Sequence, residues 1–127
     1  LKPTTPLSAG PIRYVLFIVN AISEMNLSLD KEGYLRDHLD WNHAAAELLA
    51  GDLNIELAPE HLQILQLARQ FYSTTDVVPE NRPLVKLVKE ALGNECGNSI
   101  YLMQLVGGSP AKNVAKIAGL PRPTNCL

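Results

Sequence analysis

The sequence predicts a mainly α-helical domain: a compact bundle of about five helices with a small N-terminal β-hairpin and a flexible C-terminal arm. Leucine is the most frequent residue and aromatic residues make up only 6% of the chain, a composition that favours helices over strands. Apolar residues recur at helical spacing, and glycines and prolines separate the periodic stretches. With 127 residues, the chain has the length of one domain that buries its own core.

The first elements lie between residues 26 and 51. Residues 26–37 alternate leucines with polar residues around a turn at Asp30–Gly33, so a short hairpin is expected there. Asp40 or Asn42 can then cap a helix that runs to about residue 50, and Gly51 is the expected stop.

Four further helices are expected. Prolines, caps and glycines mark their ends, because proline suits the first helical turn and glycine suits the position after the last. A helix begins at Pro59 and runs to about residue 73, and another begins between Pro79 and Pro83 and ends before Gly93. The last two are expected at about residues 98–106 and, with Ser109 as cap, from Pro110 to about residue 118.

The chain divides into three parts. Residues 26–119 make up the predicted helical domain, residues 120–127 the arm, and residues 1–25 an N-terminal extension to which we assign no function. The extension holds the most hydrophobic stretch, Tyr14–Ile22, which is too short to span a bilayer and is not followed by a convincing signal-peptide cleavage site. Met25 would be a natural initiator. We therefore expect a cytoplasmic protein with no membrane association.

Cys126, the penultimate residue, is the candidate catalytic residue. Pro121 and Pro123 exclude a helix and favour an extended path. Cys126 lies seven positions after Gly119, which gives the thiol a range of roughly 20–25 Å at ~3.3 Å per residue. Cysteine is otherwise among the most buried residue types, so a cysteine at a chain end indicates chemistry rather than packing. The alternative is an exposed cysteine without a function.

The reactivity of such a thiol depends on its surroundings, since the thiolate is the nucleophile. An unperturbed cysteine, with a pKa of about 8.5, is only a few per cent ionised near neutrality. The C-terminal carboxylate beside Cys126 disfavours the thiolate, whereas Arg122 or the cations of a docked partner favour it. A thiol that reacts when docked suits a carrier better than a self-contained enzyme.

The other residues with metal-binding or nucleophilic side chains give weaker signals. Cys96 is interpreted as structural or incidental. His38, His43 and His61 lack further ligands at metal-site spacing, so no metal site is expected. No nucleotide-binding or Ser-His-Asp motif is present, and we expect no cofactor.

Charge is distributed unevenly along the chain. Residues 1–81 hold five Lys/Arg and eleven Asp/Glu, whereas residues 82–127 hold six and two. Such a basic third can face an acidic protein or nucleic acid, although ordinary solvated helix faces give the same pattern. We define the basic rim as the six cations expected to serve partner docking: Arg82, Lys86, Lys89, Lys112, Lys116 and Arg122.

A nucleic-acid interpretation is also open at this point. The helices on either side of residues 74–79 can form a helix-turn-helix, with Arg82–Leu92 as recognition helix. Arg82, Lys86 and Lys89 would then share one face at helical spacing. The alternative is an ordinary helical pair with a basic edge.

The sequence also carries a family pattern over about four-fifths of its length, from Leu29 onward. Its most specific block runs from Lys116 to Pro121 and ends in Pro123-Thr124 and the penultimate Cys126. The earlier markers are Asp30-Lys31-Glu32-Gly33-Tyr34-Leu35, Asp40-Trp41, Leu57-Ala58-Pro59-Glu60-His61, Pro79, Arg82, Leu84-Val85-Lys86, Gly97-Asn98-Ser99, Tyr101-Leu102 and Pro110-Ala111-Lys112. In this pattern the chain resembles the DsrC/TusE family of sulfur-relay proteins. Leu62 and residues 105–109 depart from the family pattern, and Cys96 is additional.

The resemblance implies a sulfur carrier whose Cys126 accepts sulfane sulfur as a persulfide. The implied partners are an upstream persulfide donor protein and a downstream acceptor such as a tRNA thiouridylase, with tRNA met only indirectly. Ala115 stands where DsrC-type members carry a second cysteine, so the TusE type is favoured. Oxidation is then expected to give an intermolecular disulfide dimer through Cys126. The alternative function is a DsrC-like regulatory or binding module linked to sulfur metabolism, for which DNA is one candidate ligand through a helix-turn-helix.

Overall fold

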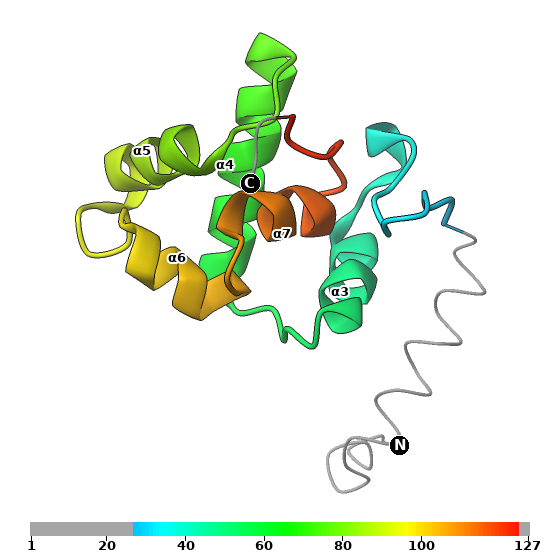
Figure 1. The fold of residues 1–127 in the computed structure, drawn as a ribbon, viewed down its shortest axis with the longest axis horizontal. Helices are drawn as coiled ribbons and strands as arrows, with labels where there is room; N and C mark the ends of the chain where they lie inside the picture. Colours follow the sequence, from blue (N-terminus) through cyan, green and yellow to red (C-terminus); the bar gives the residue numbers. More distant parts are fainter. Residues whose placement is uncertain (1–26, 125–127) are drawn as a thin grey trace, which may run out of the picture.

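The computed structural model describes residues 27–124, which fold mainly into α-helices. The prediction of a mainly α-helical domain with five helices is confirmed for these residues. After the 3-10 turn η1 (His38–Asp40), the helices are α3 (His43–Asp52), α4 (Pro59–Thr75), α5 (Asn81–Leu92), α6 (Ser99–Val106) and α7 (Pro110–Ile117) (Figure 1). The N-terminal extension of residues 1–25 and the end of the arm, residues 125–127, lie outside the described residues.

The predicted hairpin is reduced to one isolated antiparallel bridge, between Leu29 and Leu35. Between them the Asp30 carboxylate accepts the backbone N–H groups of Glu32 and Tyr34, both at 2.9 Å. The chain enters η1 at His38 soon after the bridge, so too few residues remain on that side to extend a ladder. No strand occurs within residues 27–124, and the expectation of a hairpin was wrong to that extent.

Two helix ends differ from the predicted ones. Helix α3 continues through Gly51 to Asp52, because glycine near a helix end costs only about 1 kcal/mol relative to alanine. The residue with left-handed backbone is Asn54, at φ 61°. Helix α4 likewise extends to Thr75, where Asp76 takes the left-handed conformation.

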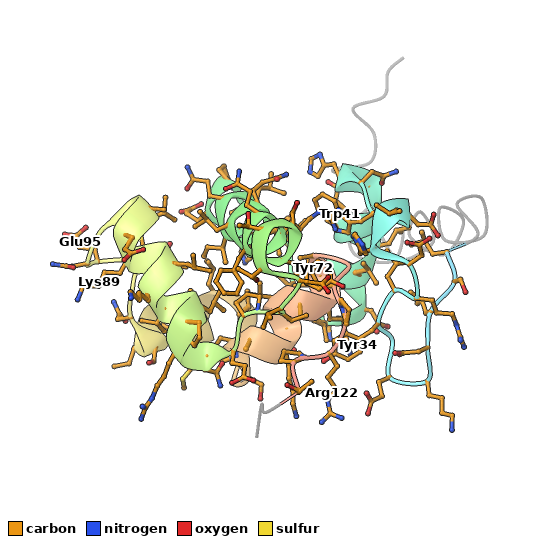
Figure 2. The ribbon with its side chains drawn as sticks, turned by 90° about the horizontal axis from the view of Figure 1, so that it is seen from above. Tyr34, Trp41, Tyr72, Lys89, Glu95 and Arg122 are labelled. Atoms are coloured by element: carbon orange, nitrogen blue, oxygen red, sulfur yellow. The ribbon has the colours of Figure 1, made fainter. Side chains whose placement is uncertain are left out.

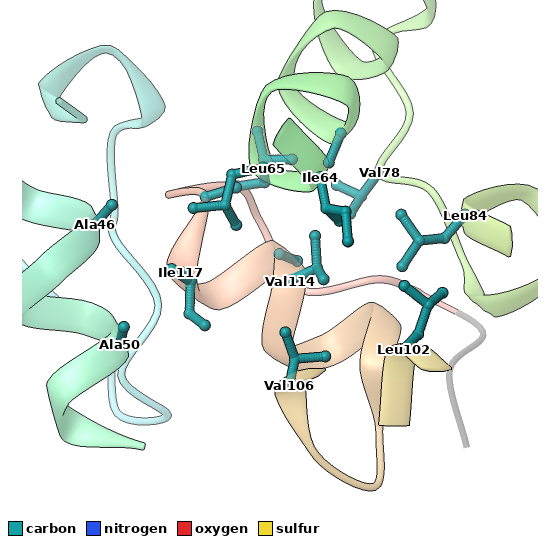
Figure 3. Packing of buried hydrophobic residues seen from close by; sticks show 14 of the residues in the cluster. Ala46, Ala50, Ile64, Leu65, Val78, Leu84, Leu102, Val106, Val114 and Ile117 are labelled. Carbon is teal, nitrogen blue, oxygen red and sulfur yellow. The ribbon is translucent and has the colours of Figure 1, made fainter. Parts of the chain in front are cut away.

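Helix α7 is the centre of the bundle and contacts each of the other four helices. Its sequence places small and branched apolar side chains on every side except the one that carries Lys112 and Lys116. The buried residues of α7 are Pro110, Ala111, Val114, Ala115 and Ile117. Figure 3 shows Val114 and Ile117 between Ile64 and Leu65 of α4, Ala46 and Ala50 of α3, and Val106 of α6. Burial of this short helix therefore stabilises the domain, because each Å² of apolar surface removed from water contributes about 25 cal/mol to the free energy of folding.

Three asparagine side chains bind backbone N–H groups at the starts of helices. Asn42 and Asn98 are the N-caps of α3 and α6, and their side-chain oxygens accept the N–H groups of Ala45 and Tyr101 at 2.8 Å. Asn81 at the start of α5 accepts the N–H of Ala111 in α7 at 2.9 Å. The Asn81 bond joins the start of α5 to the start of α7, whereas the other two bonds cap their own helices.

Candidate functional site

The candidate catalytic residue, Cys126, lies outside the described residues, and the structure describes the chain that leads to it as far as Thr124. Leu120 is buried, and its N–H donates to the Ala115 carbonyl at 2.9 Å. Pro123 is also buried, whereas Pro121, Arg122 and Thr124 are exposed. The first part of the arm is therefore packed against the helical domain.

The arm begins at a sharp turn after α7. Figures 1 and 3 show residues 120–124 turning back from the end of α7 and running toward α5. The turn depends on Gly119, whose φ of 72° is accessible to glycine at little cost. A Cβ at this position would lie 2.5 Å from Cδ1 of Trp41, so the indole also excludes any larger residue.

Trp41 and Arg69 hold this turn from the opposite side. The indole Nε1 of Trp41 donates to the Ile117 carbonyl at 2.8 Å. The Arg69 guanidinium lies 4.3 Å from the centre of the Trp41 ring, within cation–π distance. Arg69 also donates from Nη1 to the Ala118 carbonyl at 2.8 Å and from Nη2 to the His38 carbonyl at 3.2 Å. One half-buried cation thus joins α4, η1 and the end of α7, and burial lowers the pKa of Arg69.

Little in the sequence indicates this arrangement, and Arg69 is not among the predicted site residues. Two local signals could have found it. Arg69 is the only Lys or Arg between residues 37 and 81, and Trp41 is the only tryptophan in the chain. A single Arg in a helix with no other Lys or Arg indicates a specific partner, although nothing local identifies the partner as Trp41.

The basic rim does not form one patch. Lys116 lies with its Nζ 5.2 Å from the centre of the Tyr34 ring, and Arg122 lies 3.5 Å from Glu32. These two cations therefore contact the loop at residues 30–34. Lys112 is half-buried on α7. Figure 2 shows Arg122 near Tyr34 and Lys89 far from both, on the other side of the molecule.

The remaining rim cations, Arg82, Lys86 and Lys89, all lie on α5 and all are exposed. Leu84 and Val88 on the same helix are fully buried. The helical spacing thus places the three cations on the outer face of α5. Their role in docking stays a prediction.

Cys96 lies in the turn between α5 and α6, half-buried against the core. Its side chain is hydrogen-bonded to the Tyr101 hydroxyl, and this bond, together with burial, raises the pKa of Tyr101. The packing agrees with a structural role.

The histidines have separate local partners. His61 is buried; its Nδ1 accepts the N–H of Ala58 at 2.9 Å, and its Nε2 lies 2.8 Å from the Leu105 carbonyl, which requires the proton on Nε2. His38 packs edge-to-face on Tyr72, with ring centres 5.1 Å apart. Within residues 27–124, no group of three or more His, Cys, Asp or Glu side chains could hold a metal ion. None of the helices in this part of the chain is long and apolar enough to cross a membrane.

The architecture defines a class of protein: a small all-helical domain whose buried last helix leads into a Pro-rich segment with a penultimate cysteine. The family model described as "DsrC like protein" matches residues 21–127. The chain belongs to the DsrC/TusE family.

Individual relatives agree with this assignment. The chain is 41% identical to Sulfurtransferase TusE of Buchnera aphidicola over 102 residues, which cover 80% of this chain and 90% of the relative. It is 40% identical to Sulfurtransferase TusE of Escherichia coli over 101 residues, 80% of this chain and 93% of the relative.

Two solved structures have the same fold. The NMR structure of Allochromatium vinosum DsrC superposes with a TM-score of 0.73 at 40% identity, covering 80% of this chain and 90% of that chain. The crystal structure of oxidized DsrC from Archaeoglobus fulgidus, the gamma-subunit of dissimilatory sulfite reductase, gives a TM-score of 0.71 at 39% identity, covering 80% and 92%.

Proposed function

We propose that this chain is a sulfurtransferase of the relay type, which carries sulfane sulfur as a persulfide on Cys126. The observation that carries the proposal is the similarity, at about 40% identity over 80% of the chain, to proteins named Sulfurtransferase TusE, combined with a penultimate cysteine in this chain. The buried helix that precedes the arm supports it, because a fixed root gives the arm a defined starting point.

The chemistry requires one thiol and two partner proteins. The Cys126 thiolate attacks the terminal sulfur of a donor persulfide, R–S–SH, forming Cys126–S–SH and releasing R–S⁻ as leaving group. A thiolate of the acceptor then attacks the terminal sulfur of Cys126–S–SH and regenerates the Cys126 thiolate. No electrons are gained or lost overall, so neither step needs an oxidant. A persulfide is more acidic than a thiol, so the carried sulfur is ionised near neutral pH without a local base.

The partners in this proposal are an upstream persulfide donor protein and a downstream tRNA thiouridylase. The relay would end in 2-thiolation of the wobble uridine, and tRNA would be met only through the acceptor. Ala115, which is buried in α7, stands where DsrC-type relatives carry a second cysteine. This supports a single-thiol carrier over a protein that cycles through a disulfide within its own chain.

Intact-mass measurement after exposure to glutathione persulfide tests the proposal. The wild-type chain should gain the mass of one sulfur atom, located on Cys126 by peptide mapping, and lose it again to a reductant. Cys126→Ser should gain nothing, while Cys96→Ser should load like wild type. Loading that persists in Cys126→Ser, or that maps to Cys96, would contradict the proposal.

A further inference from the structure

A groove between α4 and α5 is unused by the chemistry described above. It has a volume of about 520 Å³. Phe71 of α4 and Leu87 of α5, both half-buried, supply apolar surface to its lining. The other lining residues are Arg82, Pro83, Lys86 and Glu90. The groove therefore combines an apolar surface with two cations and one carboxylate.

The two groove cations have no partner within the described part of the chain. Neither Arg82 nor Lys86 takes part in any of the ion pairs or side-chain hydrogen bonds found there. In contrast, Arg122 pairs with Glu32 and Lys116 lies over Tyr34. Val77, in the loop that joins α4 to α5, is 55% exposed. Unpaired cations beside partly exposed apolar side chains, here Phe71 and Leu87, are the features expected of a surface that binds a partner.

We propose that this groove binds an acidic, apolar segment of a relay partner, with an apolar side chain on Phe71 and Leu87 and carboxylates beside Arg82 and Lys86. The inference rests on the proposed function for the identity of the partner as a relay protein. Charge complementarity determines the chemistry of the segment, because Arg82 and Lys86 attract carboxylates and this attraction speeds association.

A protein segment fits this groove better than nucleic acid does. Phe71 and Leu87 are only half-exposed and belong to the packed helix pair, so they offer side-chain contacts rather than a stacking platform for bases. Nucleic-acid affinity also requires many phosphate contacts, and two groove cations supply few.

The position of the groove suits transfer from the arm. Figures 1 and 3 show the last described residues of the arm running toward α5. Helix α5, which lines the groove, is therefore also the helix that the last described residues approach. The rim cations Arg122 and Lys116, beside the loop at residues 30–34, are not part of this surface.

Chemical-shift mapping on the isotope-labelled full chain tests the proposal with two probes. The first is a short helical peptide with leucines along one face and glutamates beside them, and the second has lysine in place of each glutamate. The acidic peptide should shift amide signals of α5 and the second half of α4, and the basic peptide should not. Arg82→Gln/Lys86→Gln should weaken binding about ten-fold.

The matched control is Lys31→Gln/Arg36→Gln, which removes one exposed Lys and one exposed Arg beside the bridge between Leu29 and Leu35, on the other side of the domain from α5 (Figure 1). It should bind the acidic peptide like wild type. Equal binding of both peptides, shifts confined to other surfaces, or equal loss in the two double variants would overturn the proposal. So would displacement of the peptide by tRNA or a DNA duplex.

The experiments distinguish an error in the groove proposal from an error in the proposed carrier function. Glutathione persulfide needs no docking surface, so its loading of wild-type Cys126 reports on the carrier function without the groove. Absence of loading in the wild-type chain counts against the carrier function alone, whereas absence of peptide binding counts against the groove alone.

Discussion

Gly119→Ala tests whether the turn at the root of the arm depends on glycine. A left-handed backbone costs a non-glycine residue about 1–2 kcal/mol, and Gly119 has a φ of 72°. The new methyl group would lie 2.5 Å from Cδ1 and 2.9 Å from Cγ of Trp41. Trp41 cannot move away freely, because it is hydrogen-bonded to the Ile117 carbonyl and covered by Arg69. Overpacking of this kind typically costs about 1–3 kcal/mol.

The two contributions add to a loss of about 2–5 kcal/mol in the free energy of unfolding, a large share of the ~5–15 kcal/mol of an ordinary domain. Urea unfolding followed by tryptophan fluorescence measures it. Gly108→Ala is the control, because its added Cβ meets nothing within 4 Å and its φ lies outside the positive region. If Gly119→Ala unfolds within about 0.5 kcal/mol of wild type, as an ordinary surface substitution would, the turn does not depend on glycine and the described packing of Trp41 is wrong.

Three further predictions concern other parts of the chain. His61→Ala removes the link between the start of α4 and the Leu105 carbonyl and should cost about 1–3 kcal/mol in thermal unfolding; an unchanged melting temperature would contradict the link. On oxidation, non-reducing gels should show a dimer that Cys126→Ser abolishes and Cys96→Ser retains, and a mapped Cys96–Cys126 bridge within one chain would refute it. The backbone N–H of Tyr34 holds the pKa of Asp30 below its ordinary value of 3.8. The stabilisation by Asp30 is therefore fully present at pH values above that ordinary pKa and is lost as the pH falls through the lowered pKa. Asp30→Asn should therefore be less stable than wild type at neutral pH and lose less stability on acidification; parallel pH profiles would contradict this.

The helices could be predicted from the sequence because their ends are fixed by neighbouring residues. Asn42 and Asn98 cap α3 and α6 with their own side chains, and Pro59 and Pro110 occupy the first turns of α4 and α7. Each signal acts within one helical turn, so no knowledge of the fold is needed to interpret it. The end of α3 was misplaced because Gly51 is tolerated inside a helix.

The root of the arm could not be predicted in the same way. The contact between Trp41 and the Ile117 carbonyl joins residues 76 positions apart, and the bond from Arg69 to the Ala118 carbonyl joins residues 49 positions apart. No local periodicity encodes such pairs. The division of the basic rim also depends on contacts between distant residues, because Arg122 pairs with Glu32, 90 positions away. Charge counts along the chain do not show which cations are paired.

The buried start of the arm changes how far the thiol can be carried. The expected range of roughly 20–25 Å took Gly119 as the pivot, at ~3.3 Å per residue. Leu120 and Pro123 are buried, so in this conformation the last fixed point is next to Thr124. From there the covalent chain allows at most ~7 Å between the Cα atoms of Thr124 and Cys126. A partner must then either bring its own thiol to the surface of the domain or release Pro123 from its packing. The first route needs a partner docked on the helical domain itself, and the groove between α4 and α5 is the surface proposed for it.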